Sequence, residues 1–441
     1  MSPDPQGEFF NLLTRKLKER TAHLGVVGLG YVGLPLATEF AEAGFQVIGF
    51  DLNPEVVDTV NSGNSHVSDI PSDRLRPLVE AGKIKASADF SEIQKLDSVN
   101  ICVPTPLRKT RDPDVSYIVS AVEEIAKYLH KDMLVILEST TYPGTTEELI
   151  LPMLEATGLE VGKDFFLAFS PERVDPGNPN FSTRNIPKVV GGVTAACTET
   201  AATLYRSTLE AVVPVSSSRV AEMVKLLENT FRSVNIGLVN EMALMCDSMG
   251  INVWEVIDAA ATKPFGFMPF YPGPGLGGHC IPIDPFYLSW KARQVGFEAR
   301  FIELAGMVNS YMPQYVVEKV VKALNREGKA VKGSRVLLLG VAYKAESKDV
   351  REAPAIDILN RLTDLEGVLS YHDPFVPSLE GEGIHLDSVE LDAKALEDSD
   401  LTLIVTAHAG IDYGLVVEHA PVIVDTRNAL KGRSASHIWR L

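Results

Sequence analysis

Short apolar runs alternate with amphipathic stretches from residue 22 to about residue 215. The runs read HLGVVGLG, QVIGFDLN, SVNICVPTP, LVILEST, FFLAFSPE and KVVGGV. Continuous apolar runs that are separated by helices are typical of parallel strands covered on both faces. The pattern therefore predicts a first domain, residues 1–215, which is Rossmann-like and built on a doubly wound parallel sheet.

The pattern becomes helical after residue 216. A long helix is predicted over residues 219–249, because two serines precede it and Gly250 follows it as a C-terminal cap. More helix is expected in NVWEVIDAAATK and over residues 298–325. We expect a central helical domain, residues 216–327, whose long spine helix also offers a surface for a homodimer.

Strand–helix alternation resumes in the third segment, residues 328–441, and repeats the first. VIGFD resembles LSYHD, VNICVPT resembles LTLIVTA, and LVILEST resembles VIVDTRN. The glycine-rich GLGYVGLP is replaced by GVAYKAES, so this copy is expected to bind something other than a dinucleotide. The predicted fold class is α/β, with two Rossmann-like doubly wound parallel-sheet domains joined by a central helical domain.

The first apolar run ends in a GxGxxG turn formed by Gly28, Gly30 and Gly33. Such a turn lets the backbone approach a pyrophosphate at a helix N-terminus and lets the helix pack closely on its sheet. The next run ends in Asp51, where a carboxylate can accept hydrogen bonds from a ribose and would repel a 2′-phosphate. NAD is therefore the predicted cofactor, in preference to NADP, and a plain strand–helix turn is the alternative.

Other predicted cofactor residues lie in the glycine turn and at the ends of later strands, where open parallel sheets bind ligands. Thr105 in CVPTP and the pair Ser139 and Thr140 in LEST hold such positions, although Thr105 can also be a simple turn residue before Pro106. The predicted cofactor set is Gly28, Gly30, Tyr31, Val32, Gly33, Asp51, Thr105, Ser139 and Thr140.

The composition of the chain limits the kinds of partner that we expect it to bind. The chain has 441 residues, a formal net charge of −17 and an isoelectric point near 5.0, which argues against nucleic acid as a ligand. Its four cysteines are scattered without a CxxC pair, so we expect no disulfide framework, no metal site and a cytoplasmic location. No run has transmembrane length, no signal peptide is recognised, and FFNLLTRKLKER is expected to form an amphipathic helix.

Cys280 stands in GPGLGGHCIPID, a loop of glycine and proline, rather than in an apolar run. A cysteine on a glycine-lined loop can be approached closely by a ligand, as a nucleophile must be, but it can equally be a bystander. On the helix AEMVKLLENTFRSV, Lys225 and Asn229 share one face. They either reach a cavity or form a solvated polar stripe with Glu222 and Arg232.

With these motifs in view, the sequence resembles the nucleotide-sugar 6-dehydrogenases, which include UDP-glucose and UDP-N-acetylhexosamine dehydrogenases. The resemblance runs from about His23 to Asn428 and includes GLGYVGLP, VPTP, EST, SPER, EMVKLLENT, GGHCIPID and KDVREAPA. It implies an NAD-dependent enzyme that oxidises the C6 alcohol of a UDP-sugar to a carboxylate, with two NAD⁺ consumed per product.

The resemblance also implies site roles. Cys280 would be the nucleophile, which forms a thiohemiacetal and then a thioester, while Lys225, Asn229 and Asp284 are its polar partners. Glu172 or Asp284 would be the base for hydrolysis, and Thr140 would orient the water. The predicted substrate-binding residues are Lys225, Asn229, Tyr271, Gly277, Lys344 and Arg427, with the last two near the diphosphate; Arg351 is expected to brace its own loop.

The loop that contains Cys280 also indicates which sugar is the substrate. UDP-glucose enzymes of this family usually carry lysine in a CxPKD pattern, whereas this chain has Ile283. The surrounding sequence looks most like enzymes of UDP-N-acetylglucosamine, with the galactosamine and mannosamine epimers and UDP-glucose as alternatives, and implies a role in bacterial surface polysaccharides. A β-hydroxyacid dehydrogenase needs neither Cys280 nor residues 330–441, and a non-catalytic NAD sensor would need none of the predicted catalytic residues.

Overall fold

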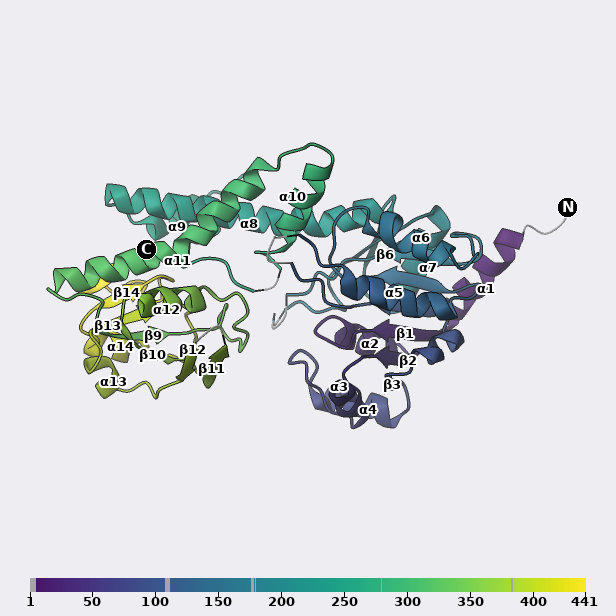
Figure 1. Cartoon of the computed structure of the whole chain (residues 1–441), viewed down its shortest axis with the longest axis horizontal. Coiled ribbons are helices and arrows are strands. Elements are labelled where there is room, and N and C mark those ends of the chain that lie inside the picture. The colour runs from purple at the N-terminus through teal and green to yellow at the C-terminus, as the bar shows by residue number, and fades with distance from the viewer. Residues whose placement is uncertain (1–4, 108–111, 176–177, 179, 279, 382–383) are drawn as a thin grey trace. The chain divides into compact units, whose positions relative to one another are not determined.

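A computed structural model describes residues 5–107, 112–175, 178, 180–278, 280–381 and 384–441, and only the backbone of residues 5–11 (Figure 1). The chain divides into two compact units. The first unit comprises Met1–Glu228 and Phe286–Gly296, and the second comprises Asn229–Pro285 and Phe297–Leu441. The chain passes between the units at three points: inside α8 (Ser218–Met249), inside α10 (Asp284–Gln294) and between Gly296 and Phe297.

The first unit is built on an eight-stranded sheet in the order β3-β2-β1-β4-β5-β6-β7-β8. Its strands are β1 (His23–Val27), β2 (Gln46–Phe50), β3 (Ile84–Ser87), β4 (Ser98–Ile101), β5 (Leu134–Leu137), β6 (Phe166–Phe169), β7 (Lys188–Gly192) and β8 (Val212–Pro214). Every neighbouring pair is parallel except β6 and β7, which are antiparallel. The predicted doubly wound sheet is confirmed, with the run KVVGGV reversed in direction.

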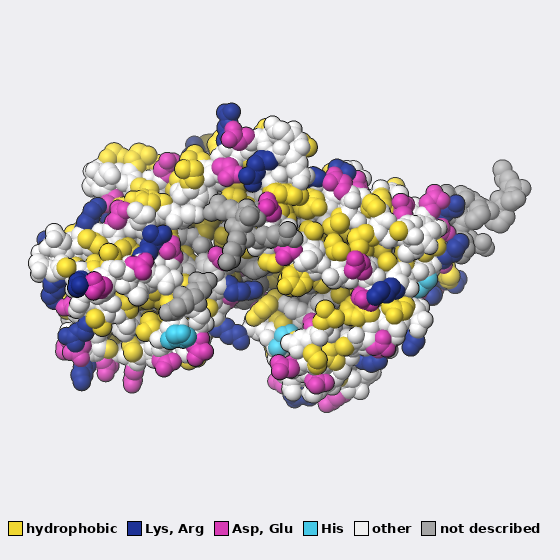
Figure 2. Space-filling view, viewed as in Figure 1, with side chains coloured by type: hydrophobic (Ala, Val, Ile, Leu, Met, Phe, Trp, Pro, Cys, Tyr) yellow, Lys and Arg dark blue, Asp and Glu magenta, His cyan; other side chains and the backbone are white. Residues whose placement is uncertain are grey.

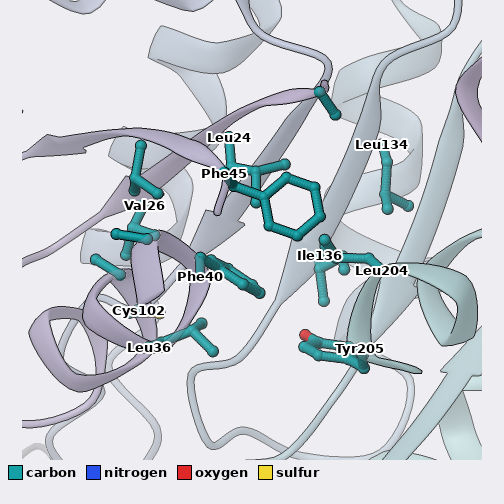
Figure 3. Packing of buried hydrophobic residues seen from close by; sticks show 14 of the residues in the cluster. Leu24, Val26, Leu36, Phe40, Phe45, Cys102, Leu134, Ile136, Leu204 and Tyr205 are labelled. Atoms are coloured by element: carbon teal, nitrogen blue, oxygen red, sulfur yellow. The ribbon is translucent and has the colours of Figure 1, made fainter. Parts of the chain in front are cut away.

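Helical segments cover both faces of this sheet, because successive residues of its buried strands point to opposite sides. On one face, Leu134 and Ile136 pack with residues of α1, α2, α3, α4 and α7, as the close-up in Figure 3 shows for part of the cluster. On the other, Val135 and Leu137 pack with α5, α6 and the start of α8. The segments are α1 (Pro5–Glu19), α2 (Gly33–Glu42), α3 (Pro54–Asn61), α4 (Ser72–Glu80), η1 (Phe90–Lys95), α5 (Ser116–Tyr128), η2 (Thr146–Ile150), α6 (Leu151–Glu155) and α7 (Ala195–Arg206).

The second unit contains a smaller parallel sheet in the order β10-β9-β13-β14-β15 and an antiparallel pair, β11 and β12. Helices α11 and α12 pack on one face of the sheet, and α13 and α14 on the other. The bounds are β9 (Arg335–Leu339), β10 (Val368–His372), β11 (Ser378–Gly381), β12 (Ile384–Asp387), β13 (Leu401–Ile404), β14 (Ile423–Asp425), β15 (Ile438–Arg440), α11 (Arg300–Arg326), α12 (Pro354–Asp364), α13 (Ala393–Glu397) and α14 (Tyr413–His419). The predicted repetition of the first fold by the third segment is confirmed.

The long helix α8 begins and ends where the sequence places its caps. The hydroxyl of Ser217 accepts the backbone N–H of Val220 at 3.3 Å, and Gly250 follows the helix with a φ of 68°, which favours glycine. Its second half buries an apolar face against α9 (Val253–Ala261), through Val239, Ala243 and Cys246 on α8.

Candidate active site

The glycine turn after β1 has room for no side chain at two of its positions. A Cβ atom on Gly28, whose φ is 90°, would lie 2.7 Å from the carbonyl oxygen of Cys102. A Cβ on Gly33 would lie 1.8 Å from the carbonyl oxygen of Gly28. These glycines are therefore required for α2 to pack against the sheet, as the spacing predicts.

Gly30 differs, because a Cβ built on it meets no atom within 4 Å. The open space beside its backbone is where the motif brings a pyrophosphate. Asp51 lies close by: one carboxylate oxygen accepts the N–H of Leu29 at 3.0 Å and the other accepts the N–H of Asn53 at 2.9 Å. Each oxygen keeps acceptor capacity for a ribose hydroxyl, so these residues fit NAD.

The other predicted cofactor residues lie at the same edge of the first unit. In the turn, Tyr31 is 46% exposed and Val32 is the residue before α2. Ser139, after β5, donates from its hydroxyl to the carbonyl of Val103 at 2.7 Å, and the partly buried Thr140 follows it. Thr105, after β4, is buried, and its carbonyl accepts the hydroxyl of Tyr287.

Glu172 follows β6 at this edge and is held on both carboxylate oxygens. One oxygen accepts the N–H groups of Arg173 and Val174, each at 2.8 Å, and the other lies 3.4 Å from the ammonium of Lys188. Burial acts to raise the pKa of Glu172, but Lys188, these backbone N–H groups and Lys225 outweigh it, so its pKa lies below the usual value. Glu172 is thus held as a carboxylate.

Lys188 also bonds a second carboxylate, that of Glu138, at 2.6 Å. Glu138 follows β5, is fully buried, and accepts hydrogen bonds from Asn100 at 2.9 Å and from the hydroxyl of Tyr205. Neither Glu138 nor Lys188 is among the residues predicted from the sequence. The only signal was a charged residue at the edge of an apolar run, in LEST and in KVVGGV.

The polar face of α8 is buried. Glu222, Lys225 and Asn229 are 0%, 8% and 6% exposed, whereas Arg232 is exposed. The alternative of a solvated polar stripe is therefore wrong for the first three. Glu222 accepts the N–H of Gly144 at 2.5 Å and both the N–H and the hydroxyl of Thr146, at 2.9 and 2.7 Å.

In the second unit, the amide of Asn229 donates to the carboxylate of Asp284 at 2.5 Å, and both side chains are buried. Asp284 begins α10, and its N–H bonds the carbonyl of Cys280 at 2.8 Å. Cys280 is exposed, whereas the other three cysteines of the chain are buried. The predicted partners Asn229 and Asp284 are thus joined, and Cys280 lies beside the turn that leads into α10.

The glycine-rich loop before Cys280 packs on the loop that follows β9. A Cβ on Gly277 would lie 2.7 Å from Cβ of Tyr343, and the N–H of Gly278 donates to the carbonyl of Arg351 at 3.1 Å. Lys344 is in this second loop, with its ammonium 5.7 Å from the centre of the Tyr343 ring. The loops that carry Cys280 and Lys344 are therefore neighbours.

Two further substrate candidates differ in their surroundings. Tyr271 is half exposed, donates to Asp258 at 2.9 Å and stacks on Trp254. Arg427 is partly buried. Its guanidinium donates to the carbonyl of Val405 at 2.9 Å and, within the described residues, pairs with no carboxylate. Burial lowers its pKa to about 10. A partly buried cation of this kind is suited to an anionic ligand.

Arg351 braces its own loop, as expected, through an ion pair with Asp349 at 2.6 Å. Over the described parts of the chain, no group of three or more His, Cys, Asp and Glu side chains is arranged to hold a metal ion. No helix in those parts is long and apolar enough to cross a membrane.

The glycine turn and Asp51, at the carboxyl edge of a parallel sheet, define a dinucleotide-binding α/β protein. Three domains of one family match the chain: the NAD binding domain over residues 22–209, the central domain over 219–311 and the UDP binding domain over 337–432. The chain belongs to the UDP-glucose/GDP-mannose dehydrogenase family.

Relatives within the family differ in their sugars. A UDP-N-acetyl-D-glucosamine 6-dehydrogenase of Pseudomonas aeruginosa is 39% identical over 80% of this chain and 83% of its own. A UDP-N-acetyl-D-mannosamine dehydrogenase of Pyrococcus horikoshii is 35% identical over 95% of this chain and 98% of its own. The solved UDP-ManNAc dehydrogenase structure from Pyrococcus horikoshii has a TM-score of 0.86 at 33% identity, over 95% of this chain and 98% of that one.

These similarities confirm three predictions: membership of this family, the fold class and NAD as the cofactor. The protein is an oxidoreductase of the UDP-sugar dehydrogenase family. The particular sugar and the roles of individual residues belong to the proposal that follows.

Proposed function

We propose that this enzyme oxidises the C6 hydroxyl of a UDP-N-acetylhexosamine to a carboxylate, with UDP-N-acetylglucosamine as the favoured substrate. The observation that carries the proposal is the exposed Cys280 on a glycine-lined loop, where its carbonyl accepts the N–H of Asp284, the residue whose carboxylate is hydrogen-bonded to Asn229. A simple alcohol dehydrogenase has no use for a nucleophile at this position.

In the first oxidation, C6 loses a hydride and its hydroxyl oxygen loses a proton, which leaves an aldehyde. Bound NAD⁺ supplies the hydride acceptor for this step and for the second oxidation. Lys225, Asn229 and Asp284 hold the C6 oxygen or a water as negative charge develops on it. The burial of all three side chains strengthens these interactions, because little water competes for them.

In the second oxidation, the sulfur of Cys280 adds to the aldehyde carbon and forms a thiohemiacetal. This adduct carries a hydride on the same carbon, whereas a free aldehyde has no good hydride to give. Loss of that hydride, and of the hydroxyl proton, leaves a thioester on Cys280. Because the sugar is covalently bound at this stage, the aldehyde does not escape.

Hydrolysis then releases the acid. A water oriented by Thr140 attacks the thioester carbon, Glu172 or Asp284 takes its proton, and the carbon–sulfur bond breaks to regenerate Cys280. The ionised state of Glu172 suits it to this role. The overall balance is one sugar alcohol, one water and two NAD⁺ converted to one uronate, two NADH and three protons.

The rest of the substrate is assigned to the second unit. The partly buried guanidinium of Arg427 and the ammonium of Lys344 would neutralise the diphosphate. Tyr271 and Gly277 would contact the nucleotide sugar. The preference for an N-acetylhexosamine rests on Ile283, at the position of a lysine in UDP-glucose enzymes, and on relatives named for acetylated glucosamine and mannosamine. A role in bacterial surface polysaccharide synthesis is part of the same proposal.

The assembly and the domain boundaries are proposed on other grounds. We propose domains at residues 1–215, 216–327 and 328–441, in a cytoplasmic homodimer. An apolar stripe on α8 supports the dimer. The α8 stripe comprises side chains that are 39–59% exposed and recur at intervals of three, four or seven residues: Val220, Met223, Leu227, Phe231, Leu238, Met245 and Met249.

An NADH assay with UDP-glucose, UDP-N-acetylglucosamine and its two epimers tests the function. The highest kcat/KM is expected for UDP-N-acetylglucosamine, with about two NADH formed per uronate because both oxidations occur on one bound sugar. The Cys280→Ser variant is expected to release no acid above background. Acid formation by that variant at the normal rate, or one NADH per product, would refute the thioester route.

A further inference from the structure

We propose that Lys188 is a positioning residue for thioester hydrolysis, because it fixes the Glu172 carboxylate in place and in its charged form. The inference rests on the proposed role of Glu172 as a base. Lys188 itself is buried and touches no reacting atom in the proposed mechanism, so it would act through Glu172.

The sheet topology explains how Lys188 reaches this place. Glu138 and Glu172 follow β5 and β6, which are parallel, so both lie at the carboxyl edge of the sheet. Lys188 is the first residue of β7, and β7 is antiparallel to β6. The reversed strand β7 therefore begins at the edge of the sheet where β5 and β6 end, and a side chain from its first residue can meet both carboxylates.

The contacts leave Lys188 little freedom. Its ammonium lies 2.6 Å from Glu138 and 3.4 Å from Glu172. Glu138 is fixed in turn by Asn100 and Tyr205, both fully buried. Of the three charged side chains, Glu172 has the largest exposed fraction, 14%, against 5% for Lys188 and 0% for Glu138. Glu172 is therefore the member of this network that water can reach.

Other charged groups around Glu172 do not replace Lys188. Lys225 on α8 also lowers the pKa of Glu172, but its effect is smaller than that of Lys188. Arg173 is the next residue, yet its guanidinium pairs with Glu228 on α8 at 2.6 Å. The thiol of Cys102 is buried beside the network, where burial and Glu138 raise its pKa, so it adds no compensating charge.

A purely structural role is the alternative, in which Lys188 only neutralises the buried Glu138. The two roles predict different pH dependences. A carboxylate whose pKa is lowered keeps its charge until the pH falls through that lowered pKa. If Lys188 positions Glu172, its removal raises the pKa of Glu172, so the carboxylate is protonated, and hydrolysis lost, at a higher pH. If Lys188 only stabilises the fold, its removal leaves the pKa of Glu172 unchanged.

The test measures the pH dependence of thioester hydrolysis in single turnovers. In Lys188→Met, the acid limb of this profile is expected to move up by about 1–3 pH units, the usual effect of one close opposite charge on a carboxyl group. In the double variant Glu138→Gln/Lys188→Met, no buried carboxylate is left unpaired at position 138. This variant is expected to be more stable than Lys188→Met but to show the same upward shift of the acid limb.

Two matched controls complete the design. Glu138→Gln alone keeps the ammonium for Glu172, so its acid limb is expected not to move up. Lys188→Arg keeps the charge and is expected to restore the original limb if the site admits the larger side chain. An unchanged acid limb in the double variant, or an equal upward shift in Glu138→Gln, would overturn the proposal.

A second readout separates this proposal from the proposed function. The Glu172 carboxyl carbon can be titrated by NMR in ¹³C-glutamate-labelled protein, with Glu172→Gln to assign the signal. An upward pKa shift in the double variant, together with unaltered hydrolysis, would retain the Lys188–Glu172 coupling but refute Glu172 as the base. An unshifted signal would refute the coupling itself, whatever substrate the enzyme oxidises.

Discussion

At the scale of single residues, the glycine turn contains two different kinds of requirement. Gly33 must be glycine because another part of the protein occupies the space of a side chain, with the carbonyl oxygen of Gly28 1.8 Å from the Cβ position. Gly30 meets no such obstacle. Glycine at position 30 would be required by the bound ligand. Gly33 is therefore needed for folding, and Gly30 for binding.

A pair of alanine variants tests this separation. Gly33→Ala is expected to lower the free energy of unfolding by about 2–4 kcal/mol, because the new methyl group forces α2 away from the sheet. Gly30→Ala is expected to unfold at nearly the original temperature but to bind NAD⁺ at least about 10-fold more weakly, a loss of ~1.4 kcal/mol. Thermal unfolding with and without NAD⁺ measures both. Normal NAD⁺ affinity in Gly30→Ala would contradict the assigned pyrophosphate position.

The sequence predicted residues whose chemistry is tied to a local motif, and missed those defined by a tertiary partner. The glycines and Asp51 could be predicted from spacing, and Asn229 and Asp284, chosen by resemblance, are indeed hydrogen-bonded. Lys188 lies sixteen positions from Glu172 and fifty from Glu138, and only the antiparallel direction of β7 brings the three together. No local pattern encodes that pairing.

At the scale of elements, Glu222 joins α8 to the loop between β5 and η2. Its carboxylate accepts N–H groups of Gly144 and Thr146 in a site that excludes water. Burial raises its pKa from 4.5 to about 7, because the hydrogen bonds only partly compensate for lost hydration. The contact between the helix and this loop is therefore sensitive to pH.

The stability of the protein should reflect this titration. The folded state binds a proton at Glu222 more tightly than the unfolded state, so this contribution is full below about pH 4.5 and is lost as the pH rises to about 7. Urea unfolding at several pH values measures the free energy of unfolding of the original protein and of Glu222→Gln. The difference between these two free energies is expected to change by on the order of 3 kcal/mol across this window. The exposed Glu80→Gln is the control. A difference that does not vary with pH would contradict the raised pKa.

The α8 stripe is a second feature at this scale. Its members recur at intervals of three, four or seven residues, which places them on one face of the helix, and a hollow on it is lined by Pro143, Val220, Met223 and Leu227 among others. On the face that Figure 2 shows, basic side chains (dark blue) and acidic side chains (magenta) are interspersed. An exposed apolar stripe beside charged side chains of both signs favours association through that stripe.

Charge placed within the stripe should break a dimer. Leu238→Glu buries a carboxylate in the proposed interface, and we expect a concentration-dependent shift from dimer to monomer in light scattering after gel filtration. Arg232→Glu puts the same side chain on α8 about 120° away from the stripe, since each residue turns the helix by about 100°. It should remain dimeric. A Leu238→Glu variant with the mass of the original protein would exclude this helix face as the interface.

Elements were predicted best where length and capping agree. The capped, 32-residue α8 closely matches the expected range, and α11 includes Pro313 as the pattern allowed. Short segments were missed: β3, β8, β15 and the β11–β12 pair have only three or four residues each. The equally short β13 and β14 were predicted because they repeat runs of the first segment, whereas the missed strands have no such counterpart and too little periodicity of their own.

At the scale of the whole molecule, a chain with a net charge of −17 is expected to bind anionic ligands. Single cations placed inside the otherwise acidic units make this binding possible. Arg427 is partly buried in the second unit, and Lys225 is buried in the first. The first unit has the dinucleotide features and the second has the proposed UDP site. The two nucleotides should therefore stabilise different parts of the chain.

Hydrogen exchange of amides can separate the two nucleotides. NAD⁺ alone is expected to slow exchange over residues 28–33, and UDP alone over residues 341–344 and 427–430. At a ligand concentration 100 times the Kd, the slowing approaches about 100-fold for amides that exchange only after the ligand leaves. Arg427→Met should lose protection by UDP and keep that by NAD⁺, whereas Gly30→Ala should do the reverse. If UDP instead protects residues 28–33, or if Arg427→Met binds UDP normally, the assignment of the diphosphate to the second unit is wrong.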